Sequence, residues 1–499
     1  MTKQKNIVKI NLSGGIVSTG DLLSIVKAAE TAQAKDIKFG TRQQLYLTVA
    51  EPKLNEFIAE LKTARINYEV NFDEYPNIVS SYVTDELFNR SNWLTEGVYA
   101  DVLDAFNYQP ALKVNIIDST QNLVPFFTGN INFISSPTAN YWYLFIRFPK
   151  MTESQHWGSL VYSADIPAIA KAIETVILAD EKVFYSKSSA TVGLLRERVQ
   201  ENYQFFHQPV IEELQLPKFT IPYYEGLNKY GQKFWLGVYR RDETFPLAFL
   251  KDVCAICLKT KIGKIYTTPW KSMLIKGIDA EDQKYWSYVL GKNHINVRHA
   301  SNELNWQVED LSADGLVIKR YLVRRFDSMD LKTHGLCFAI KTQPKSGLFG
   351  SVVIKRLLNN AKSAKKATDR FDILYTPDFN PNSKNYVVYK RKLALTVLDQ
   401  HLSDLSNLYY DQLGLNNLIG TELKSDESQQ ESTASSTYWV QQCQNCFTIY
   451  DEQYGEPENG ITPGVPFDSL SPAYTCPVCD AAKADFITIN FQTLATLGT

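Results

Sequence analysis

Two long stretches of the chain share one pattern of hydrophobic and polar positions. They run from Gly20 to Val70 and from Pro246 to Ala300, and each predicts an amphipathic helix, a β-branched strand, a short turn, a second strand and another amphipathic helix. The repeat period exceeds 200 residues, so the pattern indicates a duplicated domain rather than a solenoid. The apolar stripes of the two leading helices contain Leu22, Ile25, Val26 and Ala29 in the first copy and Leu247, Leu250, Val253, Cys254 and Cys257 in the second.

The duplication predicts an α+β body whose two halves are related by a pseudo-twofold axis, with a groove between them. The first copy occupies residues 1–75 and leads into an α+β region, residues 76–225. The second copy occupies residues 226–300 and leads into a second α+β region, residues 301–420.

A polar segment separates this body from the C-terminal residues. Residues 421–437 read TELKSDESQQESTASST and contain almost no apolar side chains. Such a segment cannot bury enough surface to fold, so we predict a flexible linker that leads to a small domain at residues 438–490.

Charge is distributed unevenly between the two parts of the chain. From Thr437 to the end there are seven acidic residues and one lysine, a net charge of −6. The first 420 residues carry a net charge of +7, and much of the positive charge lies between Lys341 and Lys392. A solvated face explains such a run, and so does electrostatic docking within the chain or to a partner.

Composition excludes several classes of protein. The chain has 499 residues, 44% of them hydrophobic and 21% charged, which is typical of a globular protein. We find no secretory signal, no apolar run long enough to span a membrane, and no indication of a nucleic-acid or membrane partner. Seven cysteines, four of them in two C-terminal Cys-x-x-Cys pairs, indicate metal ligation in a reducing compartment, so we expect a cytoplasmic location.

The two C-terminal cysteine pairs have the spacing of a metal site. Cys443 and Cys446 form one pair, and Cys476 and Cys479 form the other after 29 intervening residues. Four thiolates can close a tetrahedron around iron or zinc. The spacing alone leaves a zinc ribbon open.

The sequence between the pairs resembles rubredoxin along its whole length. The resemblance rests on IYD at 449–451, NGI at 459–461, PG at 463–464 and AKADF at 482–486, and it implies one iron bound by the four cysteines. Rubredoxins usually have glycine directly after each cysteine pair, where this chain has Phe447 and Asp480. The small aromatic core expected around the site contains Trp439, Tyr450, Phe467, Tyr474 and Phe486.

The body resembles the sulfite and nitrite reductase family. The resemblance rests on INLSGGIVSTGDL and GTRQQLYL in the first half and on YTTPWKSMLIKGID in the second. It implies a groove for sirohaem and a [4Fe-4S] cluster, with Arg42 in the place of a cofactor-facing arginine. Trp270 occupies the equivalent place in the second half and cannot neutralise a carboxylate.

The cluster ligands of that family are incomplete in this chain. Cys337 lies in the segment that resembles the first cysteine pair, but Leu331 stands where its partner should be. No Cys-x3-Cys pair follows before the linker. We therefore expect neither sirohaem nor a [4Fe-4S] cluster. The candidates for a remaining basic groove wall are Arg42, Lys113, Arg147, Lys271, Arg320, Arg324 and Arg325.

Three functions fit these observations. The favoured one is an electron-transfer protein that carries single electrons on a mononuclear iron centre with four cysteine ligands, with the degenerate body as a docking scaffold between an electron donor and a nitrite, nitrate or sulfite reductase. The second is an oxidoreductase whose body still binds a tetrapyrrole supplied with electrons by the C-terminal domain. The third is a non-redox assembly protein with a structural zinc. The sequence thus favours a redox carrier over a catalytic reductase.

Overall fold

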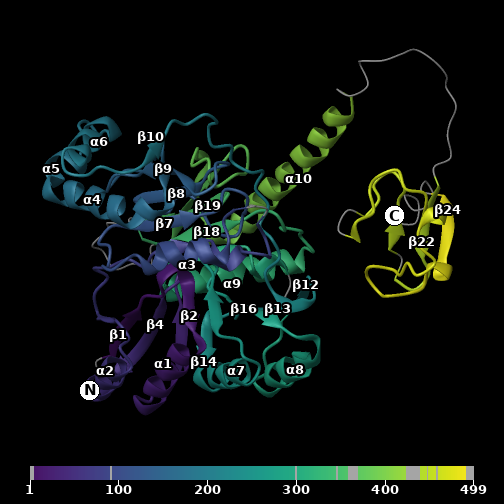
Figure 1. The fold of residues 1–499 in the computed structure, drawn as a ribbon, viewed down its shortest axis with the longest axis horizontal. Helices are drawn as coiled ribbons and strands as arrows, with labels where there is room; N and C mark the ends of the chain where they lie inside the picture. The colour runs from purple at the N-terminus through teal and green to yellow at the C-terminus, as the bar shows by residue number, and fades with distance from the viewer. Residues whose placement is uncertain are drawn as a thin grey trace. The chain divides into compact units, whose positions relative to one another are not determined.

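The chain forms two compact units, Met1–Leu415 and Asn416–Thr499. The computed structural model describes residues 5–89, 93–297, 301–343, 347–357, 369–422, 439–446, 448–456 and 459–490 (Figure 1). Helix α10 (Leu398–Glu422) continues two residues into the segment predicted as a linker. The rest of that segment, residues 423–437, lies outside the described residues, so the linker and the four body segments remain sequence-based predictions.

The first repeat folds into a five-stranded sheet with the order β14-β3-β4-β1-β5. Its helices are α1 (Thr19–Thr31) and α2 (Glu51–Thr63). The Ser18 side chain caps α1 by accepting a hydrogen bond from the Asp21 amide at 2.9 Å. The strands are β1 (Lys5–Ile10), β3 (Asp36–Phe39), β4 (Leu45–Ala50), β5 (Glu69–Val70) and β14 (Thr244–Pro246).

The second repeat forms an equivalent sheet with the order β12-β13-β16-β15-β2. Its helices are α7 (Leu247–Lys259) and α8 (Gln283–Lys292). The strands are β2 (Ile16–Ser18), β12 (Gly226–Tyr230), β13 (Lys233–Val238), β15 (Lys264–Thr267) and β16 (Met273–Ile278).

The two repeats exchange one strand each. Strand β2 precedes α1 in the sequence but pairs with β15 of the second repeat, with Val17 opposite Ile265. Strand β14 precedes α7 but pairs with β3 of the first repeat, with Phe245 opposite Ile37. Each sheet is therefore completed by the strand that leads into the first helix of the other repeat.

Helices α1 and α7 pack against each other, and the two repeats share one hydrophobic core (Figure 1). Every residue of the two predicted stripes is buried, including Cys254 and Cys257, which are fully enclosed. Burial raises the pKa of both thiols to about 12, so these cysteines pack as small apolar side chains.

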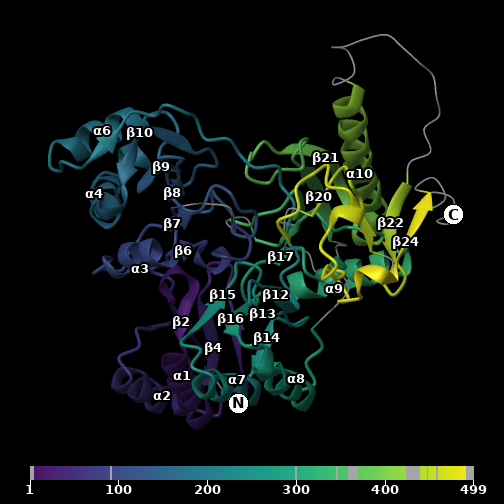
Figure 2. The same cartoon turned by 45° about the vertical axis from the view of Figure 1, so that its right-hand side comes forward.

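The α+β regions that follow the repeats are also duplicated. In the first region β6, β7 and β8 are parallel and β9 and β10 are antiparallel. Its sheet contains β6 (Val79–Ser80), β7 (Val114–Ile117), β8 (Ile131–Ser135), β9 (Tyr141–Ile146), β10 (Gln155–Tyr162) and β11 (His207–Gln208). Its helices, of which α4 and α6 are labelled beside the strands in Figure 2, are α3 (Glu96–Asp104), α4 (Ile166–Ala179), α5 (Glu181–Phe184) and α6 (Val192–Gln200).

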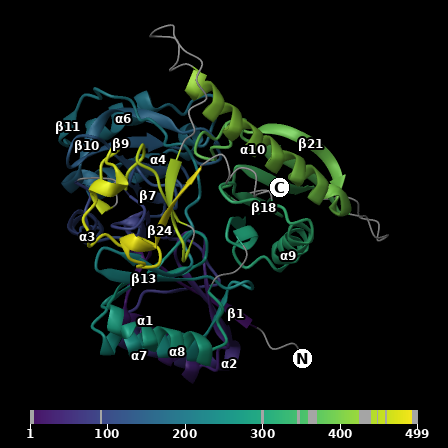
Figure 3. The same ribbon diagram turned by 90° about the vertical axis from the view of Figure 1, so that its right-hand side faces the viewer.

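The second region repeats this order of strand directions. Strands β17, β18 and β19 are parallel, and β20 and β21 are antiparallel. Helices α9 (Ala313–Ser328) and α10 share a core with one face of this sheet, and Figure 3 shows α10 alongside β21. The strands are β17 (Trp306–Val308), β18 (Phe338–Lys341), β19 (Val352–Leu357), β20 (Arg370–Tyr375) and β21 (Val387–Ala394).

The C-terminal domain is a three-stranded antiparallel sheet with long connections. Strand β22 (Trp439–Cys443) lies between β23 (Ile449–Tyr450) and β24 (Phe486–Asn490). In the described part of the chain no helix has the length and apolar character needed to cross a membrane.

Candidate functional site

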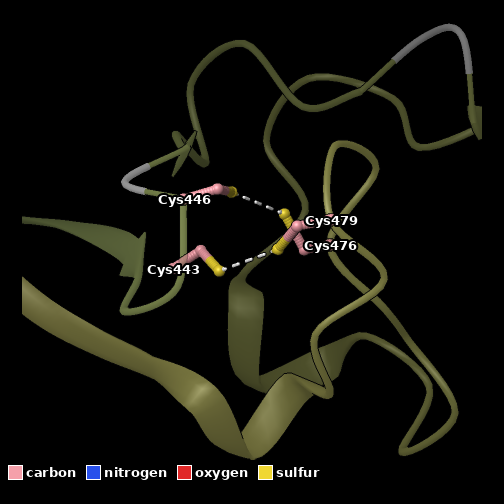
Figure 4. Close-up of side chains that lie close together, drawn as sticks. All are labelled: Cys443, Cys446, Cys476 and Cys479. Carbon is pink, nitrogen blue, oxygen red and sulfur yellow. Dashed lines mark hydrogen bonds between the residues drawn. The ribbon is translucent and has the colours of Figure 1, made fainter.

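The four C-terminal cysteines converge on one point. Cys443 ends β22 and Cys446 lies in the turn after it, while Cys476 and Cys479 bound a second turn. All four sulfur atoms lie within 4.8 Å of one another, and Figure 4 shows them facing a common centre. The structure therefore brings together the four residues that the sequence pairs predict.

The sulfur spacing fits a tetrahedral metal site. The Sγ atoms of Cys443 and Cys479 are 3.6 Å apart, and those of Cys446 and Cys476 are 3.5 Å apart. A tetrahedron with metal–sulfur bonds of about 2.3 Å has sulfur–sulfur edges of about 3.8 Å. Sulfur atoms at these distances are too far apart for a disulfide and close enough to share one ion.

The two cysteine pairs are held by equivalent turns. The Cys443 amide donates to the Thr448 carbonyl at 2.9 Å, and the Cys476 amide donates to the Ala481 carbonyl at 2.8 Å. The amides of Thr448 and Ala481 in turn donate to the sulfur atoms of Cys446 and Cys479. Each turn thus directs one N–H group at a sulfur, where it stabilises negative charge.

Asp480 adopts the backbone conformation that glycine usually provides at this place. Its φ angle is +59°, in the left-handed region, and its amide donates to the Cys476 carbonyl at 3.0 Å. Aspartate tolerates this conformation better than most non-glycine residues. Phe447, the corresponding residue of the first pair, lies outside the described residues.

An aromatic cluster supports the turns. The Tyr450 hydroxyl donates to the Val465 carbonyl at 2.8 Å, and Lys483, the domain's one cation in the sequence, lies 5.3 Å from the centre of the Phe467 ring. The prediction that Trp439 belongs to this core is wrong, because its side chain is 55% exposed. Trp439 begins β22, where alternation along the strand buries Val440 instead. The rings in mutual contact are Tyr450, Phe467, Tyr474 and Phe486.

The cysteines differ in their access to solvent. Cys443 and Cys476 are fully buried, Cys446 is half-buried and Cys479 is exposed. Val478, next to Cys479, is 70% exposed. The site therefore has a closed side and an open side.

In the body, Arg42 is held by groups of the protein itself. Its guanidinium donates to the Asn77 carbonyl at 2.7 Å, to the Val114 carbonyl at 3.0 Å and to Asn115 Oδ1 at 3.3 Å. Burial, followed by the nearby charge of Arg147, lowers the pKa of Arg42 to about 9. These contacts tie the turn of the first repeat to the start of β7.

Arg42 also lines a cavity of about 520 Å³, which we call the central cavity. Lys9 and Lys113 line the same cavity, together with three carboxylates. Asp310, one of these, accepts a hydrogen bond from the Thr41 amide at 2.9 Å, and burial raises its pKa. The cavity therefore carries three cations balanced by three acidic side chains, which are Asp73, Glu309 and Asp310.

Trp270 and Cys337 are parts of the packed interior. Trp270 is 2% exposed, donates through Nε1 to the Leu123 carbonyl at 2.7 Å, and makes an edge contact with Phe349. Cys337 is fully buried, and its sulfur accepts a hydrogen bond from the Ser351 amide at 3.2 Å. Burial raises the pKa of Cys337 to about 12.

The seven predicted groove cations do not form one wall. Arg42 and Lys113 line the central cavity, and burial together with the charges of Arg42 and Arg147 lowers the pKa of Lys113 to about 8. Lys271 is instead buried in an ion pair with Glu243 at 2.6 Å. Arg320 and Arg324 line a separate pocket of about 70 Å³, and Arg325 pairs with Asp399 at 2.6 Å.

Four cysteines around one point in a small antiparallel domain define a metal-binding domain with an all-thiolate site. Similarity to known proteins identifies its family. The rubredoxin family model matches residues 440–486. Rubredoxin 4 of Rhodococcus sp. (strain Q15) is 42% identical over 55 residues, which are 11% of this chain and 92% of that protein. The rubredoxin of Acinetobacter baylyi is 44% identical over 45 residues, 9% of this chain and 83% of that protein. Through its C-terminal domain, the chain belongs to the rubredoxin family.

The body has the fold of a solved structure. The NirA protein of Mycobacterium tuberculosis matches with a TM-score of 0.61 over 80% of both chains, at 14% sequence identity. This likeness establishes a NirA-like fold. The high molecular weight rubredoxin of Moorella thermoacetica is 43% identical over 60 residues, which are 12% of this chain and 25% of that protein.

Proposed function

We propose that this chain is an electron-transfer protein that carries single electrons on a mononuclear iron bound by Cys443, Cys446, Cys476 and Cys479. The observation that carries the proposal is the tetrahedral spacing of the four sulfur atoms in a domain of the rubredoxin family. When bound, the iron supplies a one-electron ferric–ferrous couple.

The residues of the domain suit this role. The amides of Thr448 and Ala481 are directed at sulfur atoms, so they favour the more negative, reduced state of the site. Burial of Cys443 and Cys476 keeps water from one side, whereas exposed Cys479 offers the other side to a redox partner. Acidic residues dominate the domain, so a basic partner surface is favoured.

The body, in this proposal, is a docking scaffold that serves a nitrite, nitrate or sulfite reductase. The NirA-like fold is the observation behind this choice of partner. A [4Fe-4S] cluster requires four thiolates, and the body has three cysteines in all. Two of these lie in the core of the repeats and Cys337 lies in a different core, so we propose that the body holds no such cluster.

The NirA-like fold and the central cavity favour one alternative, an oxidoreductase whose body binds a sirohaem-like tetrapyrrole. Two observations speak against it. The guanidinium of Arg42 is occupied by main-chain and amide oxygens, and the carboxylates of Glu309 and Asp310 would repel those of a tetrapyrrole.

A visible spectrum of the full chain, purified anaerobically after iron-replete expression, tests the proposal. A ferric–thiolate charge-transfer spectrum with one iron per chain is the expected result. Additional Soret absorption would support the alternative. A colourless protein that contains only zinc would contradict both redox functions.

A further inference from the structure

A second cavity of the body, which we call the basic cavity, lies between the two α+β regions. It has a volume of about 450 Å³. Arg147, directly after β9, contributes from the first region, and residues of β18, β19 and β20 contribute from the second. Further lining residues are Phe127, Thr128, Leu348, Lys384 and Tyr386.

The charges of the basic cavity are unbalanced. Four cations line it, and none of its described lining residues is acidic. The central cavity shares Thr128, Gly347 and Leu348 with it but has a balanced set of charges. Of these two cavities, only the basic cavity has more cationic than acidic lining residues. The four cations are Arg147, Lys341, Lys355 and Lys384.

Two of the lysines are neighbours on adjacent strands. Lys341 of β18 lies directly opposite Lys355 of β19 in the parallel register. Like charges directly opposite each other repel, and solvent reduces the repulsion here because Lys355 is exposed. The charge of Lys355 adds to burial in lowering the pKa of Lys341, although Glu309 partly offsets this effect. Val353 and Leu374, also paired across strands, add an apolar part to the cavity lining.

The other two cations are held in fixed positions. The Arg147 guanidinium donates to the carbonyls of Gly129 and Thr128, both at 2.9 Å. Lys384 has a φ angle of +56°, which is strained for a lysine, and its ammonium lies 5.2 Å from the centre of the Phe349 ring. Burial and the charge of Arg147 lower the pKa of Lys384 to about 8.

No carboxylate forms an ion pair with Lys355 or Lys384 in the described ranges. Of these two lysines Lys384 is half-buried, where a charge without a counter-charge is costly, whereas Lys355 is exposed and is screened by water. The cavity therefore combines a cationic wall with apolar and aromatic side chains from Phe127, Leu348 and Tyr386. An anion with an aromatic body complements both features.

We propose that the basic cavity is a binding site for a small aromatic anion that carries two or more phosphate or carboxylate groups. The proposal does not rest on the iron site, because every residue of the cavity belongs to the body. Nucleotides and aromatic polycarboxylates share this chemistry.

Equilibrium titration of the full, iron-loaded chain with ADP, trimesate and citrate tests the proposal. ADP represents a phosphate source, trimesate an aromatic carboxylate source, and citrate an anion without an aromatic ring. Saturable binding of ADP or trimesate, tighter than that of citrate and weaker at high ionic strength, is the expected result. Whichever of the two binds identifies the source.

Single-charge variants locate the binding site. Lys355→Gln and Lys384→Gln should each weaken binding about tenfold, as expected for loss of one charge-assisted hydrogen bond. Lys27→Gln, which removes an exposed charge from α1, should leave the affinity unchanged. Near-ultraviolet circular dichroism confirms that each variant is folded. Lys355 is exposed, so Lys355→Gln should disturb the fold less than Lys384→Gln. Absence of saturable binding, equal affinities in all three variants, or a preference for citrate would overturn the proposal.

Discussion

Gln43 and Lys271 occupy the same position in two copies of one turn. Their φ angles are +64° and +55°, both in the left-handed region. The amide of Gln43 donates to the Gly40 carbonyl and that of Lys271 donates to the Thr268 carbonyl, at 2.9 and 3.0 Å. The duplication therefore extends to a strained backbone geometry, although neither copy has glycine at this position.

The two turn residues use this geometry differently. Gln43 Nε2 donates to the Thr267 carbonyl at 2.9 Å, so it connects the first repeat to the second. Lys271 Nζ lies 2.6 Å from Glu243 and 3.6 Å from Asp310, inside the body. The first copy therefore has a neutral amide, that of Gln43, between the two repeats, and the second copy has a buried charge, that of Lys271.

Removing the Lys271 charge should strongly destabilise the body. In Lys271→Met, buried Glu243 loses its partner at 2.6 Å and keeps only Lys319 at 3.9 Å, and Asp310 loses the same ammonium, so we expect a loss of about 3–5 kcal/mol in the free energy of unfolding. Urea denaturation measures the change. The double variant Lys271→Met/Glu243→Gln should recover part of it, because no uncompensated carboxylate remains at position 243.

An exposed ion pair provides the control for that experiment. Lys292 pairs with Asp252 at 2.8 Å with 49% of its side chain exposed, so Lys292→Met should cost no more than about 1 kcal/mol. Equal losses in Lys271→Met and Lys292→Met would show that the buried pair has no special role.

Replacing Cys476 with serine should abolish the iron spectrum. The hydroxyl is a poor substitute for one of four thiolates, and Cys476 is fully buried at the closed side of the site. Metal analysis and the visible spectrum measure the loss. Cys257→Ser is the matched control, because Cys257 lies in the core of the repeats and should not affect iron content. Iron retained in Cys476→Ser would exclude the four-cysteine site.

Asp480 should lower the reduction potential of the iron. Its charge is adjacent in sequence to Cys479 and disfavours the more negative, reduced state. Both Asp480→Asn and Asp480→Gly should therefore raise the midpoint potential measured by spectroelectrochemical titration. Only the glycine variant should also gain thermal stability, by at most about 1 kcal/mol, because it removes the cost of the positive φ angle. A shift of equal size in Asp468→Asn would indicate a general charge effect.

Anion binding in the basic cavity should weaken as the pH rises through about 8. The lowered pKa of Lys384 means that this side chain loses its proton earlier than an exposed lysine, and with the proton it loses its attraction for an anion. Titration with trimesate from about pH 6.5 to 9.5 should show at most about a tenfold loss of affinity per pH unit. Lys384→Arg should move the loss to higher pH, since a guanidinium stays charged.

Arg147 and Cys337, which lie near Lys384, should not produce this dependence. Arg147 is a guanidinium, and burial raises the pKa of the Cys337 thiol to about 12, so it stays neutral. Burial also lowers the pKa of Lys341, whereas Lys355 is exposed. The variants Lys341→Gln and Lys355→Gln identify any contribution of these two lysines to the pH dependence. An unchanged affinity across the pH range would contradict the prediction.

The sequence predicts those parts of the structure whose signals are local. Helices α1 and α7 follow from the helical period of their apolar residues, and the metal cysteines follow from two short Cys-x-x-Cys motifs. The exchange of β2 and β14 could not be predicted, because a three-residue strand has too little pattern to reveal its partner. Pairing of so short a strand is decided by tertiary packing.

The basic cavity also depends on tertiary structure. Lys341, Lys355 and Lys384 belong to the positively charged stretch of the sequence, for which a solvated surface is the simplest explanation. Only the parallel pairing of β18 with β19 places two of them side by side on one face. The register of the strands decides which of these lysines line the cavity, and the composition of the sequence does not specify that register.

The exchanged strands have a consequence for the synthesis of the protein. The sheet of the first repeat lacks β14 until Pro246 has left the ribosome, and β2 has no partner until β15 is made. The N-terminal repeat therefore cannot complete its fold as it emerges, and each sheet must wait for contacts that span more than 200 residues. A nascent chain of this body therefore exposes open sheet edges until β14 and β15 have been made, and open edges are the part of a sheet most prone to pair with another chain.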